Sequence, residues 1–207
     1  MTLFKNKYRV ETARLKNWDY GSSALYFITI CCANREHFFG EIRDGQMILN
    51  GIGEIVQHEW LKTPGIRPDM NLTLEEFIVM PNHFHAIINI GKNRYNSFGG
   101  IHGINGNHDI RGVDGRDAMH RVSTINTDTN TSINAGNIFG PQSKNIVYIV
   151  RGFKSAVSKQ VRTDVSYFGW QRRYHDHIIR DKEAHLHIQQ YIVNNPQNWQ
   201  EDRFYTV

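Results

Sequence analysis

The stretch EFIVMPNHFHAIINI (residues 76–90) decides the fold of this chain. Two runs rich in β-branched and aromatic residues, 72–80 and 83–90, are separated only by Pro81-Asn82. Such runs predict two strands that form either a hairpin or one bent strand. Side chains two positions apart in a strand lie on the same face, so His83 and His85 share one face. The opposite face is apolar throughout and comprises Phe84, Ala86, Ile88 and Ile90.

The segments on either side of this hairpin complete an α+β pattern. Strands are rich in β-branched and aromatic residues, whereas amphipathic helices repeat apolar residues every three or four positions. Asp181 precedes the last helical pattern and is a suitable N-cap. In chain order, these patterns predict strands at 24–32 and 46–50, a helix at 53–63, the hairpin, a helix at 145–161, a strand at 170–180 and a helix at 181–195. The order predicts a ferredoxin-like antiparallel sheet with helices on one face.

The composition changes sharply between the two halves of this pattern. Residues 99–140 contain eight glycines and six asparagines, and a loop of this length is unusual in a compact domain. We therefore expect one domain over residues 1–207 that carries a flexible insertion at about 92–142. A binding loop is the alternative interpretation, because His102, His108 and His120 lie within the insertion.

The overall composition excludes several classes of protein. The chain has 207 residues, 40% of them hydrophobic, which excludes a fully disordered chain. Lys and Arg number 24 against 20 Asp and Glu, so the net charge of +4 permits a nucleic-acid partner without requiring one. The two cysteines, Cys31 and Cys32, are adjacent, which excludes a disulfide-stapled scaffold. The longest apolar run, 24–33, is too short to span a bilayer and the N-terminus lacks an apolar signal region, so we expect a cytoplasmic protein without a membrane partner.

The paired histidines are the first candidate for chemistry. The spacing of His83 and His85 lets two imidazoles approach one cation from the same side, although two surface histidines would show the same pattern. His175 and His177 repeat this spacing in the later strand. They could join the first pair in a four-nitrogen zinc site, or one of them could lie just outside such a site. A polar strand face is again the alternative.

A tyrosine on the last predicted helix is the second candidate. Tyr191 and Asn195 are four residues apart and share a helix face. A tyrosine hydroxyl can act as a nucleophile, although a helical tyrosine is more often a packing residue. Several basic and aromatic residues could contact phosphates and stack on bases, or form only a solvated face: Arg151, Lys154, Lys159, Trp170, Arg172 and Arg173.

Taken in order, the motifs resemble those of a known family. MPNHFH (80–85), WQ (170–171), HIIR (177–180) and YIVNNP (191–196) are similar to motifs of the single-tyrosine HUH transposases of the insertion-sequence 200 type. The resemblance is closer to the REP-associated tyrosine transposases and extends over nearly the whole chain except the insertion and the termini.

The resemblance implies a ferredoxin-like fold and a specific site. His83 and His85 match the histidines that bind Mg²⁺ or Mn²⁺, and Tyr191 matches the catalytic tyrosine. Asn195 falls where relatives place a polar third metal ligand, while His177 and Arg180 match positions near the site. The implied activity is cleavage and rejoining of single-stranded DNA through a 5′-phosphotyrosine intermediate, with a DNA hairpin in the substrate.

Two other functions remain open. One is a domesticated DNA- or RNA-binding protein that binds hairpins without cleaving them. The other is a metal-dependent phosphodiesterase in which water replaces Tyr191 as the nucleophile. Only the tyrosine mechanism produces a covalent protein–DNA adduct. Both a monomer and a homodimer are compatible with the resemblance, and the sequence does not identify the cognate hairpin.

Overall fold

The computed structural model describes residue 15, residues 18–97 and residues 144–206. Most of the expected insertion, including His102, His108 and His120, lies outside the described residues. The elements are β1 (Ala24–Cys31), β2 (Gly40–Arg43), β3 (Gln46–Leu49), α1 (Gly51–Leu61), α2 (Thr63–Ile66), β4 (Leu72–Met80), β5 (His83–Ile90), α3 (Ile146–Val161), β6 (His175–Ile179) and α4 (Lys182–Asn194). None of the helices in the described ranges combines the length and apolar character that crossing a membrane requires.

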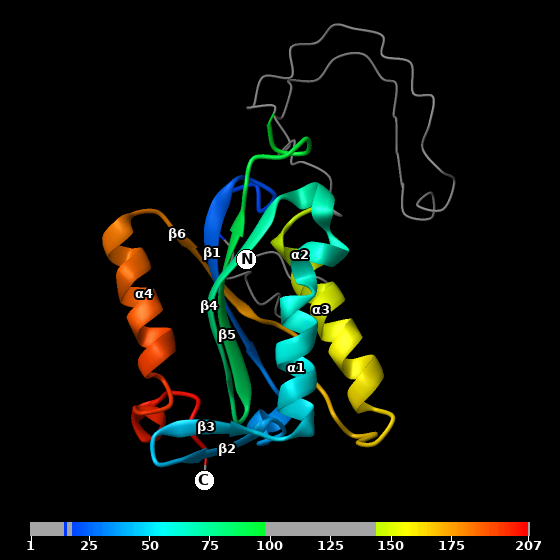
Figure 1. The fold of residues 1–207 in the computed structure, drawn as a ribbon, viewed down its shortest axis with the longest axis vertical. Helices are drawn as coiled ribbons and strands as arrows, with labels where there is room; N and C mark the ends of the chain where they lie inside the picture. Colours follow the sequence, from blue (N-terminus) through cyan, green and yellow to red (C-terminus); the bar gives the residue numbers. More distant parts are fainter. Residues whose placement is uncertain (1–14, 16–17, 98–143, 207) are drawn as a thin grey trace, which may run out of the picture. The chain divides into compact units, whose positions relative to one another are not determined.

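The described residues form a four-stranded antiparallel sheet in the order β4-β5-β1-β6 (Figure 1). With α1 and α3 as the crossover helices, this is the strand order of a ferredoxin-like βαββαβ unit. The predicted α+β class is confirmed. The 72–90 segment is a hairpin rather than one bent strand, because β4 and β5 pair back on each other from Met80 and His83 onward. β2 and β3 form a separate two-stranded hairpin, of which the sequence patterns predict only the second strand.

The main core lies between the sheet and the pair α1 and α3 (Figure 1). Phe84 of β5 packs against Trp60 of α1 and Phe153 of α3, with ring centroids 5.1 and 5.3 Å away. All three side chains are nearly inaccessible to solvent. The alternation of β5 therefore buries the phenylalanine side of the strand and directs the two histidines to the other face of the sheet.

The expectation that the helices cover one face is wrong for α4. This helix contacts β4 and β5 from the side opposite α1 and α3 (Figure 1). Ile192 of α4 packs with Phe27 and Ile87, which lie on the histidine face. Burial of this second apolar cluster favours the packing of α4 on the histidine face of the sheet.

Side-chain caps position the helices that carry the candidate residues. Asp181 Oδ1 accepts a hydrogen bond of 2.8 Å from the amide of Ala184, which confirms the predicted N-cap of α4. Asn145 caps α3 in the same way through the amide of Tyr148. β6 begins at His175, five residues later than predicted, because Trp170 forms only an isolated bridge with Cys32 before the chain leaves the sheet.

Candidate active site

His83 and His85 are completely buried on the α4 face of the sheet, with ring centroids 4.4 Å apart. Each ring is oriented by a neighbour. His83 Nδ1 lies 2.9 Å from Asn82 Oδ1, and His85 Nδ1 lies 2.8 Å from Thr29 Oγ1. The Asn82 oxygen can only accept, so His83 Nδ1 donates and the lone pair of the neutral ring is at Nε2. These contacts orient both rings, and they leave the Nε2 of His83 as an acceptor in the site.

Burial lowers the pKa of both histidines below its usual range. For His85, the neighbouring His83 lowers the pKa further. Both rings are therefore neutral near pH 7, and the neutral imidazole is the form that binds metal ions.

Asp202 is a site residue that the sequence analysis missed. It follows the short 3-10 helix Trp199–Glu201 near the end of the chain. In the described part of the chain, the ligand atoms of His83, His85 and Asp202 lie within 4.8 Å of one another. Asp202 Oδ1 accepts a hydrogen bond from the amide of Phe204, which fixes the carboxylate. No periodic pattern links this aspartate to the other residues, and it lies beyond the quoted motifs.

Tyr191 projects from α4 toward the same point. Its hydroxyl lies 3.2 Å from His85 Nε2 and donates a hydrogen bond of 3.1 Å to Asp202 Oδ2. Its ring packs edge-on against Phe27, and 37% of the residue is exposed. Burial and the Asp202 carboxylate raise the pKa of Tyr191 to about 12, so the phenol keeps its proton near pH 7.

Asn195, the C-cap of α4, is buried beside the same carboxylate. Its Nδ2 donates a hydrogen bond of 2.7 Å to Asp202 Oδ2. Its Oδ1 and the Nε2 of His83 are buried acceptors without a hydrogen-bond partner among the described residues. Unsatisfied buried acceptors are costly, and a divalent cation would satisfy both. A set of imidazole, amide and carboxylate donors therefore fits a metal ion at this point.

The C-terminal segment closes the site on one side. The ring of Phe204 lies 4.7 Å from the ring of His83, centroid to centroid. Asn82 Nδ2 donates to the carbonyl oxygen of Phe204 at 2.9 Å, and Arg35 donates to that of Arg203 at 2.7 Å. These contacts hold Asp202 in place and shield the histidines from water.

A cavity of about 550 Å³ opens beside the Tyr191 side chain. It is also lined by Asp202, His177 and Arg203. A neighbouring cavity of about 440 Å³ shares His177 and is lined by Arg180. Both residues expected near the site therefore line cavities, His177 the one at Tyr191 and Arg180 the one beside it.

The four-histidine zinc site does not form among the described residues. His175 and His177 are on β6, whereas His83 and His85 are on β5, and β1 lies between these strands. Two strand spacings amount to roughly 9.6 Å, which is too far for all four rings to share one ion.

The expected DNA-binding residues fall into two groups. Lys154 Nζ donates to the carbonyl oxygen of Gln171, and Trp170 Nε1 donates to that of Lys154, so these two partly buried side chains support the fold. The remaining four are exposed: Arg151, Lys159, Arg172 and Arg173.

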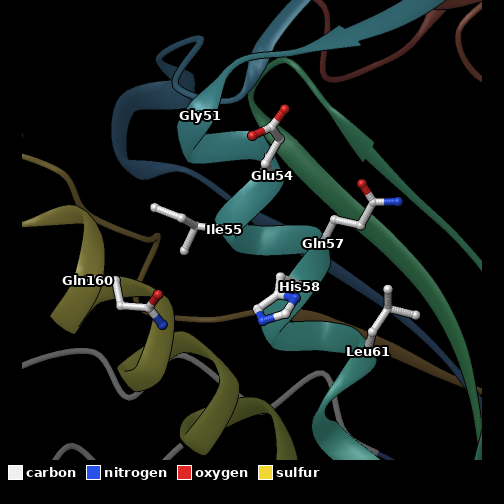
Figure 2. A pocket seen from close by; sticks show the side chains of 7 residues that line it. All are labelled: Gly51, Glu54, Ile55, Gln57, His58, Leu61 and Gln160. Carbon is white, nitrogen blue, oxygen red and sulfur yellow. The ribbon is translucent and has the colours of Figure 1, made fainter.

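Another hollow, of about 480 Å³, lies on the α1 and α3 side of the sheet (Figure 2). Glu54, Gln57 and His58 of α1 line it, together with Gln160 of α3. Because α1 and α3 pack on the opposite face of the sheet from α4, this hollow is not part of the Tyr191 site.

Comparisons with known proteins find a solved structure with a similar fold and a protein with a similar sequence. A solved REP-associated tyrosine transposase bound to a REP hairpin superposes with a TM-score of 0.50 and 15% identity, over 92% of this chain and 74% of that one. This likeness shows a shared fold. A solved protein from Deinococcus radiodurans R1 gives a TM-score of 0.36, with 12% identity over 90% of this chain and 97% of that one.

No model of a protein family matches the sequence. An uncharacterised protein from Haemophilus influenzae (strain ATCC 51907 / DSM 11121 / KW20 / Rd) is 36% identical over 196 residues, which cover 93% of this chain and 91% of that protein. Identity at this level over nearly the full length of both chains indicates common descent. The chain therefore belongs to the same family as this Haemophilus influenzae protein.

Proposed function

We propose that this chain is a metal-dependent, single-tyrosine transposase that cleaves and rejoins single-stranded DNA. The observation that carries the proposal is the contact between the Tyr191 hydroxyl and His85 Nε2, 3.2 Å apart and beside two buried acceptors that lack partners. The fold shared with a REP-associated tyrosine transposase and the motifs around both residues support it.

In this reaction, the Tyr191 oxygen attacks the phosphorus of a phosphodiester. The new bond between tyrosine and phosphorus replaces the bond to the 3′ oxygen, which leaves as a hydroxyl group. The 5′ phosphate then stays on Tyr191, and a second 3′ hydroxyl reverses the attack to rejoin the DNA. Because Tyr191 is protonated at rest, it needs a base, and Asp202 already accepts its hydrogen bond.

His83, His85, Asn195 and Asp202 are the residues that would hold Mg²⁺ or Mn²⁺. When bound, such a cation stabilises the negative charge that develops on the phosphoryl oxygens. The chain's own part is to keep both imidazoles neutral and oriented through Thr29 and Asn82 and to exclude water with the C-terminal segment.

The substrate in this proposal is single-stranded DNA that contains a hairpin. The cavity beside Tyr191, with His177 and Arg203 in its lining, is large enough for the nucleotide at the scissile bond. Arg151, Lys159, Arg172 and Arg173 are available for the backbone of the DNA, and the affinity should fall steeply with salt.

A covalent-adduct assay tests the proposal. The protein is incubated with a pool of hairpin-bearing, 3′-labelled single-stranded DNA, in Mn²⁺ or in EDTA. The expected result is a labelled protein that forms only with Mn²⁺ and does not form with Tyr191→Phe. Tyr205→Phe is the matched control, because Tyr205 is equally exposed, at 37%, and should still form the adduct.

Two outcomes would contradict the tyrosine mechanism. Cleavage of the DNA without an adduct would favour a phosphodiesterase that uses water. Binding of the hairpin with neither cleavage nor adduct would favour a domesticated binding protein.

A further inference from the structure

Arg67 is a buried cation without a counter-ion among the described residues. Only 8% of the residue is exposed, and its Nε has no hydrogen-bond partner. Its guanidinium contacts the ring of Tyr148, with Cζ 5.4 Å from the ring centroid. An unpaired buried charge destabilises a protein by several kcal/mol, so its retention requires a compensating role.

The neighbouring helix is shaped to admit this guanidinium. At Gly152 of α3, a Cβ atom would lie only 2.2 Å from Arg67 Nη2. Any other residue at position 152 would displace the arginine. A glycine in a helix interior lowers the stability of the helix by roughly 1 kcal/mol relative to alanine. The close approach of Arg67 therefore lowers the stability of α3.

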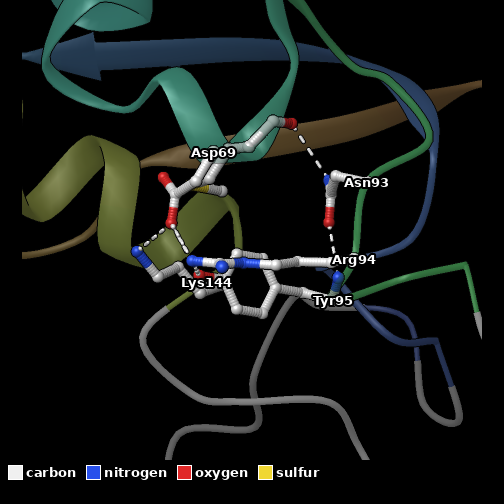
Figure 3. A network of polar contacts seen from close by, with 6 residues as sticks. Asp69, Asn93, Arg94, Tyr95 and Lys144 are labelled. Carbon is white, nitrogen blue, oxygen red and sulfur yellow. Dashed lines mark hydrogen bonds and ion pairs between the residues drawn. The ribbon is translucent and has the colours of Figure 1, made fainter. Parts of the chain in front are cut away.

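Two further cations meet at Asp69, two positions along the chain from Arg67. Lys144 Nζ lies 2.8 Å and Arg94 Nη2 lies 3.6 Å from Asp69 Oδ2, so two cations share one carboxylate (Figure 3). Lys144 also lies 6.0 Å from the ring centroid of Tyr148, on which Arg67 packs. Tyr95 adds a second aromatic face and is in contact with both Arg94 and Lys144. We refer to Arg67, Asp69, Arg94, Tyr95, Lys144 and Tyr148 as the Arg67 cluster; its formal net charge is +2.

The Arg67 cluster is distinct from the Tyr191 site. Arg94 and Tyr95 follow the end of β5, whereas His83 and His85 are at its beginning. The seven residue steps of β5 span roughly 23 Å. Successive base pairs of a duplex are about 3.4 Å apart, so a DNA molecule that reached both places would need at least about seven base pairs.

We propose that the Arg67 cluster binds the phosphodiester backbone of a nucleic acid, in which the buried Arg67, the partly buried Lys144 and the exposed Arg94 contact the phosphates. A guanidinium presents a planar fork of N–H groups that matches the oxygens of a phosphate. Tyr148, which is 40% exposed, provides a surface on which a sugar or a base packs. That the bound nucleic acid is DNA rests on the proposed function; the binding of a phosphodiester backbone does not.

The test measures DNA affinity and protein stability on the same variants. Arg67→Met keeps a straight side chain along Gly152 but removes the charge, and Arg67→Lys keeps the charge but removes the planar fork. The probe is a fluorescent DNA hairpin with a stem longer than ten base pairs and a single-stranded tail. Anisotropy is followed from 50 to 300 mM KCl, with Arg43→Gln as a control that removes an exposed cation elsewhere.

For Arg67→Met we expect about tenfold weaker binding at 100 mM KCl and a salt slope reduced by about one, with a melting temperature equal to or above that of the wild type. Arg67→Lys should retain the salt slope and lose only part of the affinity. Unchanged affinity and slope relative to Arg43→Gln would overturn the proposal. So would a lower melting temperature with unchanged DNA binding, because the guanidinium would then serve the protein's own packing.

A parallel adduct assay separates this proposal from the proposed function. At saturating concentrations of the hairpin DNA, where weaker affinity no longer limits occupancy, Arg67→Met should form the Tyr191 adduct as the wild type does. Loss of hairpin affinity with normal adduct formation supports the cluster. Absence of any adduct in the wild type, together with the expected loss of affinity in Arg67→Met, would reject the tyrosine chemistry and retain the cluster.

Discussion

The hydroxyl of Tyr191 lies 3.2 Å from Nε2 of His85, although 106 residues separate them in the sequence. The two residues come from α4 and β5, which pack face to face on the histidine side of the sheet. The lone pair that would bind a metal ion at His85 thus faces the phenol that would attack the phosphate. The hydroxyl has one proton and donates it to Asp202 Oδ2, so the proposed nucleophile and the proposed metal site compete for this carboxylate oxygen.

This competition predicts that Tyr191→Phe binds Mn²⁺ more tightly than the wild type. Removing the hydroxyl removes a hydrogen bond worth about 0.5 to 1.5 kcal/mol, so the affinity should rise about two- to tenfold. Isothermal titration calorimetry with Mn²⁺ alone measures the effect. If the affinity instead fell by about tenfold or more, the phenol would be a ligand rather than a competitor.

Asp202→Asn should weaken the metal site without unfolding the protein. The amide keeps the shape of the side chain but loses the charge that complements a divalent cation, so we expect Mn²⁺ affinity to fall about ten- to a hundredfold. Glu201→Gln is the matched control, because it removes the same charge from the exposed neighbouring residue. Equal losses in the two variants would indicate a general effect of charge and remove Asp202 from the site.

Thr29→Val tests the orientation of His85. The buried Thr29 hydroxyl lies 2.8 Å from His85 Nδ1, and valine has nearly the same shape without the hydrogen bond. We expect a loss of about 1 to 3 kcal/mol in unfolding free energy and about tenfold weaker Mn²⁺ binding. Thr29→Ser retains the hydroxyl and should restore most of the metal affinity; failure of this rescue would assign the loss to packing.

Asp69→Asn should make the stability of the protein depend less on acidic pH. Hydrogen bonds from Lys144 and Tyr95 lower the pKa of Asp69 to about 2, below its ordinary value of about 3.9. A lowered pKa stabilises the folded state above the ordinary value, and this stabilisation is lost as the pH falls toward 2. At pH 7 the variant should be less stable by about 1 to 2 kcal/mol.

Urea denaturation at pH 7, 4 and 2.5 checks the Asp69 prediction. The difference between wild type and variant should shrink progressively across this range. A difference that stayed constant with pH would mean that the carboxylate stabilises the fold through packing rather than through its charge.

Replacing residues 98–143 with a short Gly-Ser linker should leave the rest of the domain folded. The described strands and helices pack on one another through core clusters formed by their own residues. We expect a melting temperature within a few degrees of the wild type and unchanged Mn²⁺ binding. A large loss of thermal stability would show that the segment is part of the core, and a loss of Mn²⁺ binding would implicate its histidines.

The fold was predictable where one short segment carries its own pattern. The strands of the hairpin at 72–90 and the cap at Asp181 depend on residues within a few positions of each other, and both are confirmed. The placement of α4 was not predictable in this way. The face that holds His83 and His85 also holds Ile87 and Phe27, and the sequence pattern does not reveal that these residues of different strands form one apolar cluster.

The candidate site likewise has features that follow from local sequence and features that depend on distant segments. The period of a strand places His83 beside His85, and the period of a helix places Tyr191 above Asn195, so these pairs follow from local geometry. The hydrogen bonds of Lys154 and Trp170 depend on neighbouring segments of the chain and do not follow from the residue types alone.

By itself, the sequence determined the antiparallel α+β fold, the pairing of the histidines on one face and the helix that carries Tyr191. Only the tertiary structure decided that α4 covers that face, that Asp202 joins the histidines and that Arg67 is buried without a counter-ion in the described part of the chain. The reason is physical. Periodicity acts over a few residues, whereas these contacts join distant segments through the burial of apolar surface, which a local pattern does not specify.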